Sequence, residues 1–351
     1  MGVGDGRGRA WSFLSPCGPH VDQDGGGVVR VLVTGGAGFI GSHLAERLVG
    51  LGHEVVVLDS EATGRREDVP AGADFRRGDV GRVVDLEQIF DIGLDAVAHI
   101  AGQVSLIRSF TDPVVDLRTN VEGTVNVLGC CIRHRVPRLL YASSMTVYGN
   151  NGTLPTSEDT PCTPVSYYGV TKYAAERYVH TTAERSDLDF DFGVTSFRMY
   201  NVYGPRQALD NPYQGVLGIF LGNMLRNEPL TIFGDGQQSR DFVYIDDVVD
   251  AWAAALTNEA CHGQVINLGS GRRLAINDLA RQVLATCGRD DRMIARAPSR
   301  PGEQREVEAD ITRAAALLGW KPQIAFADGL ARTVDWARSV TGPPAVPVAP
   351  A

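Results

Sequence analysis

The chain has 351 residues, 44% of them hydrophobic and 21% charged, which suits a globular protein with one large domain or two fused lobes. Its net charge of −9 argues against a nucleic-acid surface, which would gather Lys and Arg. No apolar run approaches the ~20 residues that cross a bilayer, and the six cysteines are scattered without metal-ligand spacing. We therefore expect a cytoplasmic protein with reduced thiols and with no bound metal, nucleic acid or membrane.

Strand and helix patterns begin after a glycine-rich stretch, residues 1–27, that we expect to be a flexible tail. From there VVRVLVT, EVVVLD, DAVAHIA and RLLYASS are typical of buried strands, and HLAERLVGLG, VVDLEQIF and NVEGTVNVLGCCIRH have helical spacing. Strands that alternate with helices predict right-handed crossovers and a parallel sheet covered on both faces. The predicted fold class is therefore α/β, with a Rossmann-type doubly wound parallel sheet over residues 28–200.

The composition of the sequence changes after about residue 200, where segments rich in Gly, Pro, Asn and Asp alternate with helical stretches. We expect residues 201–340 to form mainly a smaller α/β substrate lobe, with some chain returning to the Rossmann sheet. Such a lobe would lie over the carboxyl ends of the strands, where open α/β sheets bind their ligands. Residues 341–351 are expected to form a second flexible tail.

Residues 34–41, TGGAGFIG, follow the first expected strand and open a helix. Gly35, Gly38 and Gly41 give the loop a dinucleotide-binding spacing. One glycine permits a tight turn, another lets the backbone approach a pyrophosphate, and the last lets helix and strand pack closely. The helix N-terminus also offers unpaired N–H groups to the anion. Alone the motif is weak, because glycine-rich turns are common.

Two acids follow the next strands. Asp59 closes the second strand, where a carboxylate accepts hydrogen bonds from the adenosine ribose and repels a 2′-phosphate, so NAD is favoured over NADP. Arg65 and Arg66 lie close by in the sequence and would suit that phosphate. Asp59 can instead be a surface turn acid. Asp79 is placed to reach the adenine, and it can instead be a helix N-cap.

Residues 166–176, SYYGVTKYAAE, place Tyr168 and Lys172 four apart in a helical stretch, so the two share one face. A free phenol has a pKa near ~10 and is a poor base, whereas a nearby ammonium and a cationic nicotinamide both favour phenolate. Lowering that pKa by ~3 units needs about 4 kcal/mol, which partly desolvated charges within a few ångströms can supply. The glycine loop and the serine-bearing strand end that precede this pair support a catalytic role for it.

In this order, TGGAGFIG, YASSMTVYG and YGVTK resemble the extended short-chain dehydrogenase/reductase family, and more narrowly its NAD-dependent nucleotide-sugar epimerase/dehydratase branch. Further segments extend the resemblance over about residues 28–340, namely FRMYNVYGPRQ, GDGQQSRDFVYIDDVV, INLGSG, RPGEQREVEAD and LGWKP. The sequence is most like UDP-glucose 4-epimerase-type enzymes. The resemblance implies bound NAD, a nucleoside-diphosphate sugar in the cleft between the lobes, and a homodimer formed through the helices around 112–135 and 163–185.

The resemblance implies a role for each matching position. The catalytic residues fall on Ser144, Tyr168 and Lys172. The cofactor contacts fall on Gly35, Gly38, Phe39, Ile40, Gly41, Asp59, Asp79, Val80, Ala101, Gly102, Asn120, Tyr168, Lys172 and Tyr200. The substrate contacts fall on Ser144, Thr146, Asn201, Arg240, Arg300 and Glu303. Plainer interpretations stay open: Arg240 and Arg300 can be surface ion pairs, and Glu303 a solvated acid. Asn120 can be a helix cap, and Tyr200 plain core.

The reaction depends on the two residues that follow Ser144. In the 4,6-dehydratases of this family an Asp-Glu pair stands there and handles the C5 proton and the leaving hydroxyl, and the related decarboxylases carry an acid at the second place. Met145 and Thr146 occupy both places in this chain. We therefore expect oxidation to a 4-keto sugar, with Tyr168 as the base, followed by rotation of that sugar and return of the hydride to its other face. This predicts NAD-dependent C4 epimerisation, first of UDP-glucose and UDP-galactose.

Other outcomes stay open from the sequence. The same scaffold supports 4,6-dehydration, decarboxylation or epimerisation at another carbon. A non-catalytic protein that senses NAD is a remote alternative, because such proteins usually lose the Tyr or the Lys of the pair. Residues near 103–108, 211–214 and 299–305 are expected to select the nucleotide and the sugar. Ser143 is expected to be structural.

Overall fold

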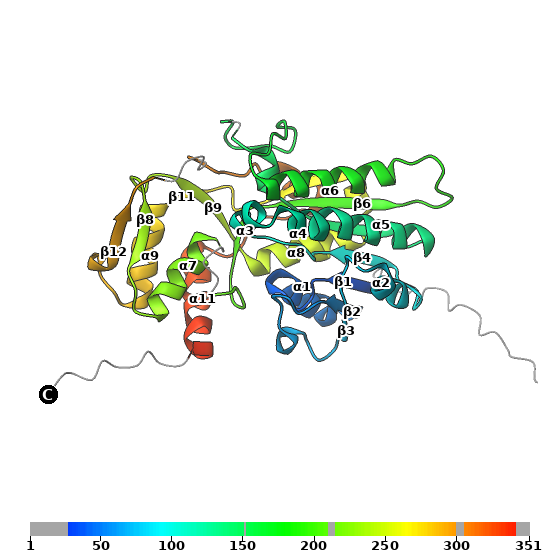
Figure 1. Ribbon diagram of the computed structural model, residues 1–351, viewed down its shortest axis with the longest axis horizontal. Helices are drawn as coiled ribbons and strands as arrows, with labels where there is room; N and C mark the ends of the chain where they lie inside the picture. The colour runs from blue at the N-terminus through cyan, green and yellow to red at the C-terminus, as the bar shows by residue number, and fades with distance from the viewer. Residues whose placement is uncertain (1–26, 151, 210–214, 300–304, 342–351) are drawn as a thin grey trace, which may run out of the picture.

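The computed structural model describes residues 27–150, 152–209, 215–299 and 305–341 (Figure 1). Arg300 and Glu303 lie outside these residues, as does nearly all of the two expected tails. Within the described residues, no helix is long and apolar enough to cross a membrane. The same residues hold no group of three or more His, Cys, Asp or Glu arranged to bind a metal ion.

A seven-stranded parallel sheet forms the middle layer, in the order β10-β6-β5-β4-β1-β2-β3. Its strands are β1 (Arg30–Thr34), β2 (Glu54–Asp59), β3 (Asp74–Arg77), β4 (Ala96–His99), β5 (Arg138–Ser144), β6 (Gly193–Met199) and β10 (Gln264–Leu268). β5 and β6 are buried along their whole length, as expected when both faces of a parallel sheet are covered. The doubly wound α/β fold predicted from the sequence is confirmed.

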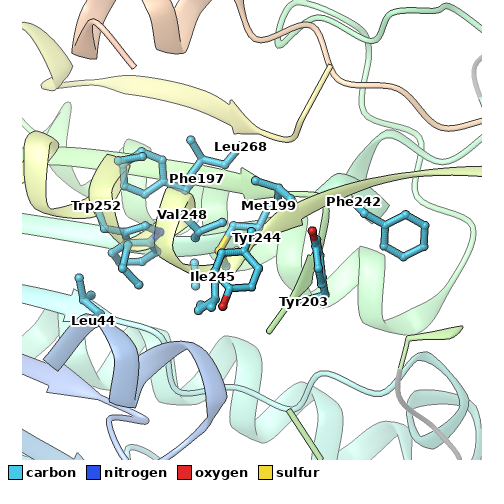
Figure 2. Packing of buried hydrophobic residues seen from close by; sticks show 14 of the residues in the cluster. Leu44, Phe197, Met199, Tyr203, Phe242, Tyr244, Ile245, Val248, Trp252 and Leu268 are labelled. Atoms are coloured by element: carbon cyan, nitrogen blue, oxygen red, sulfur yellow. The ribbon is translucent and has the colours of Figure 1, made fainter. Parts of the chain in front are cut away.

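Helices cover both faces of this sheet (Figure 1). One face carries α1 (Phe39–Gly50) and α8 (Ile245–Leu256), and the other carries α2 (Val83–Phe90), α5 (Gly123–Arg133) and α6 (Tyr167–Ala183). Leu44 and Leu48 lie one turn apart on α1 and belong to the same buried cluster as Val31 of β1. Figure 2 shows this cluster, in which Phe197 of β6 and Trp252 of α8 have ring centroids 4.9 Å apart.

A helical stretch with two irregularities precedes α5. It consists of α3 (Leu106–Thr111), α4 (Pro113–Leu117) and a π-helical turn, η2 (Arg118–Glu122). Asp112 separates the first two helices, and its side chain accepts a 3.3 Å hydrogen bond from the N–H of Val115. π turns within helices are rare and often occur at functional sites. This one contains Asn120, where the sequence predicted an ordinary helix.

The two smaller sheets and three further helices gather at one end of the molecule, on the left in Figure 1. A three-stranded sheet has the order β11-β9-β7, formed by β7 (Asn201–Tyr203), β9 (Ser239–Tyr244) and β11 (Arg273–Ala275), and β8 (Leu230–Phe233) pairs with β12 (Ile294–Ala297). The helices here are α7 (Val216–Leu225), α9 (Ile276–Cys287) and α11 (Phe326–Thr341). α10 (Thr312–Leu318) packs near β10, and four short 3-10 turns are η1 (Arg66–Asp68), η3 (Met145–Tyr148), η4 (Glu259–Cys261) and η5 (Asp291–Met293).

The chain passes between these two regions more than once. Both α8 and β10 come after β7 in the sequence, yet α8 packs on α1 and β10 pairs with β6 in the central sheet. Residues beyond 201 therefore complete the layer that the first half of the chain begins. The lobe boundaries expected at residues 28, 200 and 340 stay predictions.

Candidate active site

The glycine loop lies between β1 and α1, where closely packed backbone leaves no room for side chains. Gly35 has a φ of +69°, and a Cβ atom on it would lie 2.8 Å from the backbone of Ala101. A Cβ on Gly41 would collide with the carbonyl oxygen of Gly35, and a Cβ on Gly38 would lie 3.2 Å from that oxygen. The loop thus presents bare backbone at the end of the first strand.

Phe39 and Ile40 are the first two residues of α1, and Gly38 is its N-cap with an extended backbone. The N–H groups of a helix's first turn have no acceptor within the helix, and they carry the positive end of its dipole. This helix start therefore suits a negatively charged group such as a pyrophosphate.

Asp59 ends β2 with its carboxylate turned toward the glycine loop. Oδ2 accepts a 3.0 Å hydrogen bond from the N–H of Ala37, and Oδ1 accepts a 2.7 Å bond from the N–H of Glu61. Only 8% of the residue is exposed, so it is not a surface turn acid. Each carboxylate oxygen keeps a second lone pair that can accept a hydrogen bond from a ribose hydroxyl.

The two arginines considered for a 2′-phosphate make other contacts. Arg65 pairs with Asp68 at 3.3 Å, and the guanidinium carbon of Arg66 lies 4.9 Å from the ring centroid of Phe75. These contacts leave the acid at the end of β2 as the charged group turned toward the loop, which favours NAD over its 2′-phosphorylated form.

Asp79 and Val80 follow β3 and differ in exposure. Asp79 is exposed, and its Oδ1 accepts a 2.9 Å hydrogen bond from the N–H of Gly81. The N-cap of α2 is Arg82, so Asp79 does not cap that helix. Val80 has 4% exposure and packs in the core beneath α2 and α5, which leaves its backbone as the part that can meet an adenine.

Gly102, Asn120 and Lys172 meet at the carboxyl end of β4. A Cβ atom on Gly102 would lie 2.9 Å from both Asn120 Oδ1 and Lys172 Nζ, so glycine keeps this corner open. Asn120 is buried within the π turn and caps no helix there, because the N-caps of η2 and α5 are Leu117 and Glu122. Lys172 is 3% exposed, and its Nζ donates a 3.0 Å hydrogen bond to the carbonyl of Ala142.

Ser144 ends β5 and lies between Thr146 and Tyr168. Thr146 donates to Ser144 Oγ from its hydroxyl at 3.0 Å and from its N–H at 3.3 Å. Because Oγ receives these two hydrogens, its own hydrogen is left to point toward the phenol of Tyr168, and Ser144 lowers the pKa of that phenol. A donor on the phenol oxygen favours phenolate, so this relay suits a tyrosine that acts as a base.

Burial works against that ionisation. It raises the pKa of Tyr168 to about 12, while Ser144 lowers this pKa and Asp116 raises it. Burial also lowers the pKa of Lys172 to about 8, against the raising effect of Asp116. We expect the Lys172 ammonium and a cationic nicotinamide to lower the pKa of this phenol together, and the protein itself supplies the first of these two charges. A further positive charge is required, and oxidised nicotinamide carries one.

A buried ion pair behind the site was missed in the sequence. Arg198 of β6 contacts Glu176 of α6 at 2.6 Å, with side chains 6% and 2% exposed. Ser143 donates to the same carboxylate at 2.6 Å. The available signal was the spacing of Tyr168, Lys172 and Glu176, which recur every four residues on one helix face.

A cavity of about 330 Å³ adjoins the strand end at Met145. Its walls are Met145, Tyr148, Gly149, Asn150, Gly152, Thr153, Leu154, Thr156, Tyr200, Arg305, Glu306 and Val307. Tyr200 is 6% exposed and packs with Tyr148 and Val307, so it is a core residue that also forms part of the wall. Met145 packs against the same cluster, which places a thioether beside Ser144.

Asn201 and Arg240 lie on neighbouring strands, β7 and β9, of the smaller sheet. Asn201 Nδ2 donates a 3.0 Å hydrogen bond to the carbonyl of Asp241, and Arg240 Nη1 donates a 2.7 Å bond to the carbonyl of Ser239. Both side chains are partly exposed. Their predicted companions in substrate binding, Arg300 and Glu303, lie outside the described residues.

These residues together fit a dinucleotide. The backbone cradle of Gly35 and Gly38 meets a helix N-terminus, and Asp59 lies one strand away at the same edge of the sheet. The corner kept open by Gly102 lies beside the buried ammonium of Lys172. The anion site suits the pyrophosphate of NAD, the ribose acceptor suits its adenosine ribose, and the open corner suits its nicotinamide side.

Known proteins are similar to the chain in sequence. Residues 31–269 match the NAD dependent epimerase/dehydratase family. The UDP-glucose 4-epimerase of Mycolicibacterium smegmatis is 37% identical over 319 residues, which cover 89% of this chain and 99% of that protein. UDP-glucuronic acid decarboxylase 4 of Arabidopsis thaliana is 34% identical over 329 residues, covering 90% of this chain and 70% of that one.

Solved structures agree with this match. UDP-glucose 4-epimerase from Thermotoga maritima, solved with UDP-glucose, has a TM-score of 0.84 at 35% identity and covers 89% of this chain and 100% of its own. The enzyme of the same name from Thermus thermophilus, in complex with NAD, has a TM-score of 0.80 at 36% identity, with 88% and 99% covered. A dTDP-glucose 4,6-dehydratase from Streptomyces venezuelae reaches 0.79 at 31% identity, with 88% and 97% covered. Because a family model matches most of the chain and relatives more than 30% identical cover nearly all of it, the chain belongs to the NAD-dependent epimerase/dehydratase family.

Proposed function

We propose that this protein epimerises a nucleoside-diphosphate sugar at C4 through a transient 4-keto intermediate, with NAD as its tightly bound cofactor. The observation that carries the proposal is the strand end itself. Ser144, Tyr168 and Lys172 supply the groups for alcohol oxidation, while Met145 and Thr146 stand where a carboxylate pair would be needed for elimination. UDP-glucose and UDP-galactose are the pair best supported, because relatives at 37% and 35% identity carry the name UDP-glucose 4-epimerase.

Three side chains of the protein have separate roles in the proposed epimerisation. Tyr168 accepts the proton of the C4 hydroxyl and later returns it. When substrate binds, Ser144 turns its single hydroxyl hydrogen from the phenol to the same sugar oxygen and orients it. Lys172 holds a buried positive charge beside the corner formed by Gly102. NAD, when bound, supplies hydride exchange with the sugar carbon. Because the chain places no carboxylate directly after Ser144, the keto sugar has no base for its C5 proton at that position and returns to the alcohol level.

The remaining assignments are part of this proposal. The pyrophosphate of the cofactor lies on Gly35, Gly38, Phe39, Ile40 and Gly41, its adenosine on Asp59, Asp79 and Val80, and its nicotinamide side on Ala101, Gly102, Asn120 and Tyr200. The substrate contacts Thr146, Asn201, Arg240, Arg300 and Glu303. Fork-shaped arginine donors suit a diphosphate, and an acid suits ribose hydroxyls.

The test is incubation of the purified protein with a panel of nucleotide sugars in D₂O, without added NAD. The expected result is both C4 epimers of one sugar, with no deuterium on carbon. Deuterium at C5 or C6 would point to 4,6-dehydration, and release of carbon dioxide from a uronate to decarboxylation. Tyr168→Phe is expected to abolish turnover, and Tyr167→Phe, its exposed neighbour, to retain it. Full turnover by Tyr168→Phe would remove the base from the mechanism.

We also propose that the protein is a homodimer. Large apolar side chains 39–63% exposed gather on the neighbouring helices α3 to α6 and on the residues just before α3 and α6, namely Val104, Leu106, Ile107, Phe110, Val114, Leu117, Val125, Val165, Tyr167, Val170 and Tyr178. Phe110 of α3 and Tyr167 of α6 have ring centroids 5.2 Å apart, which joins the two halves of this surface. Contiguous apolar surface of this kind supports a protein interface. The cytoplasmic location stays a prediction.

Light scattering during gel filtration tests the assembly. Phe110→Glu and Val170→Glu are expected to halve the molar mass. Val84→Glu, on exposed α2, is the matched control and is expected to leave the dimer intact. A monomeric parent protein would contradict the proposal without affecting the reaction.

A further inference from the structure

Asp116 is a buried carboxylate that the mechanism above does not use. It lies on α4 with no exposed surface. Gln103 Nε2 donates to its Oδ1 at 2.6 Å, Asn120 Nδ2 donates to the same oxygen at 3.2 Å, and Thr171 Oγ1 donates to Oδ2 at 2.6 Å. All three donors are neutral, so they satisfy the oxygens without cancelling the charge. A buried charge of this kind needs an opposite charge nearby.

Lys172 is a buried positive charge beside this carboxylate network. It directly follows Thr171 on α6, and its Nζ and Asn120 Oδ1 flank the same point at Gly102. Asn120 thus contacts Asp116 on one side and the lysine's corner on the other. The lysine's own contacts are also neutral: the carbonyl of Ala142 at 3.0 Å, and the ring of Tyr141, whose centroid lies 5.4 Å from Nζ.

The other titratable groups packed around Lys172 do not supply its counter-charge. Glu176, one turn along α6, is matched by Arg198 of β6. His99 of β4 has its pKa lowered to about 3 by burial, so it is neutral. Burial raises the pKa of Tyr141 well above its usual value, so that phenol is neutral too. Arg118, which begins the π turn η2 just after the helix of Asp116, is exposed to water.

We propose that Asp116 is the buried counter-charge of Lys172, a positioning residue that keeps the lysine ammonium charged and holds Thr171 and Asn120 beside it. The inference rests on the proposed function only for the catalytic use of that ammonium. The carboxylate raises the pKa of both Lys172 and Tyr168, so it preserves the lysine's charge and makes the phenol harder to ionise. The bound cofactor's positive charge then decides when the tyrosine ionises, rather than the lysine alone.

The test is an ultraviolet titration of Tyr168, taken as the difference between the protein and its Tyr168→Phe variant. In an Asp116→Asn background, the pKa of Tyr168 is expected to fall by about one unit. Thr171→Val is the matched control: it removes one hydrogen bond from the network and keeps the charge, so the pKa is expected to stay in place. An unchanged pKa in Asp116→Asn, or an equal shift in Thr171→Val, would overturn the inference.

A second readout uses turnover. Loss of the carboxylate is expected to shift both limbs of the pH profile of kcat/KM to lower pH. The reason is that the Asp116 carboxylate raises the pKa of both the Tyr168 phenol and the Lys172 ammonium. A purely structural role would lower the profile without moving its limbs. Asp116→Ser removes the same charge with a smaller side chain, and it takes the place of Asp116→Asn should that variant not fold. The titration needs no substrate, so it tests the counter-charge role of Asp116 even if the protein shows no epimerase activity.

Discussion

Ser143 Oγ donates a 2.6 Å hydrogen bond to Glu176 Oε2, which ties the end of β5 to the middle of α6. The next residue, Ser144, instead accepts a hydrogen bond from the hydroxyl of Thr146 and lowers the pKa of the Tyr168 phenol. Two adjacent serines therefore face two different tasks, one within a buried ion-pair network and one at the proposed reacting oxygen.

The first prediction separates these two serines. Ser144→Ala is expected to lower kcat about 10²-fold, because it removes the hydrogen bond that orients the reacting oxygen, and to change the melting temperature little. Ser143→Ala is expected to leave kcat within a few-fold and to lower the free energy of unfolding by about 1–2 kcal/mol, since a hydrogen bond to a carboxylate is lost. Turnover and chemical denaturation of both variants check this, and equal effects on kcat would contradict it.

The second prediction concerns the ion pair behind the site. Glu176→Ala is expected to cost about 3–5 kcal/mol of stability, because Arg198 is left as an unpaired buried charge. The matched control is Glu228→Ala, which breaks the exposed pair with Arg226 and is expected to cost less than about 1 kcal/mol. Urea denaturation measures both. A loss for Glu176→Ala as small as the control's would mean that Arg198 finds another partner.

The third prediction tests the backbone cradle. Gly41→Ala is expected to abolish cofactor binding, since its Cβ would collide with the carbonyl of Gly35 and force α1 away from the loop. Gly50→Ala lies at the other end of the same helix with nothing within 4 Å of its Cβ, and it is expected to bind normally. The measurement is the NAD content of the purified protein after denaturation. Retention of NAD by Gly41→Ala would show that the helix can shift without loss of the site.

Features that depend on residues close together in the sequence could be predicted, and contacts between residues far apart in the sequence could not. The Tyr168–Lys172 pair and the glycine loop are local, because spacing of three or four residues fixes which side chains meet. Ser143 donates to Glu176, which is 33 residues away, and Arg198 of β6 donates to the same carboxylate. No local pattern in the sequence joins these three residues. The network could be seen only once α6 had been placed on β5 and β6.

The π turn at Asn120 has a different origin. Its residues have ordinary helical preferences, and an i→i+5 turn leaves no mark on the 3.6-residue periodicity used to predict helices. Asp116, one turn earlier in the sequence, was passed over for a related reason. It follows Pro113 and two valines in a helix whose Leu117 and Val114 are exposed, so the pattern gave no sign that its carboxylate is buried.

The fourth prediction is a loss of stability in acid caused by His99. Thr124 Oγ1 donates to the carbonyl of Asn120, so His99 Nε2 must donate to that hydroxyl, and Nδ1 accepts from Thr34 at 2.7 Å. Both nitrogens are thus satisfied in the neutral form, and burial lowers the pKa from 6.5 to about 3. Between these values the unfolded chain binds a proton that the folded chain does not.

Stability is therefore expected to fall as pH falls from about 6.5 to about 3, with a full contribution from this residue of about 5 kcal/mol. His99→Gln cannot take up the proton, so its free energy of unfolding is expected to depend less steeply on pH in that window. Parallel slopes for the parent and His99→Gln would assign the acid loss to other groups.

The late return of β10 to the central sheet has a consequence for synthesis on the ribosome. β6 ends at Met199, but its outer neighbour begins only at Gln264. During translation the N-terminal part of a chain emerges first, so every nascent molecule passes through a stage in which β6 is an open edge with unpaired backbone groups. A ribosome stalled between these two residues would display the most aggregation-prone form of the protein, with α8 also absent from the face of α1 until residue 256 has emerged.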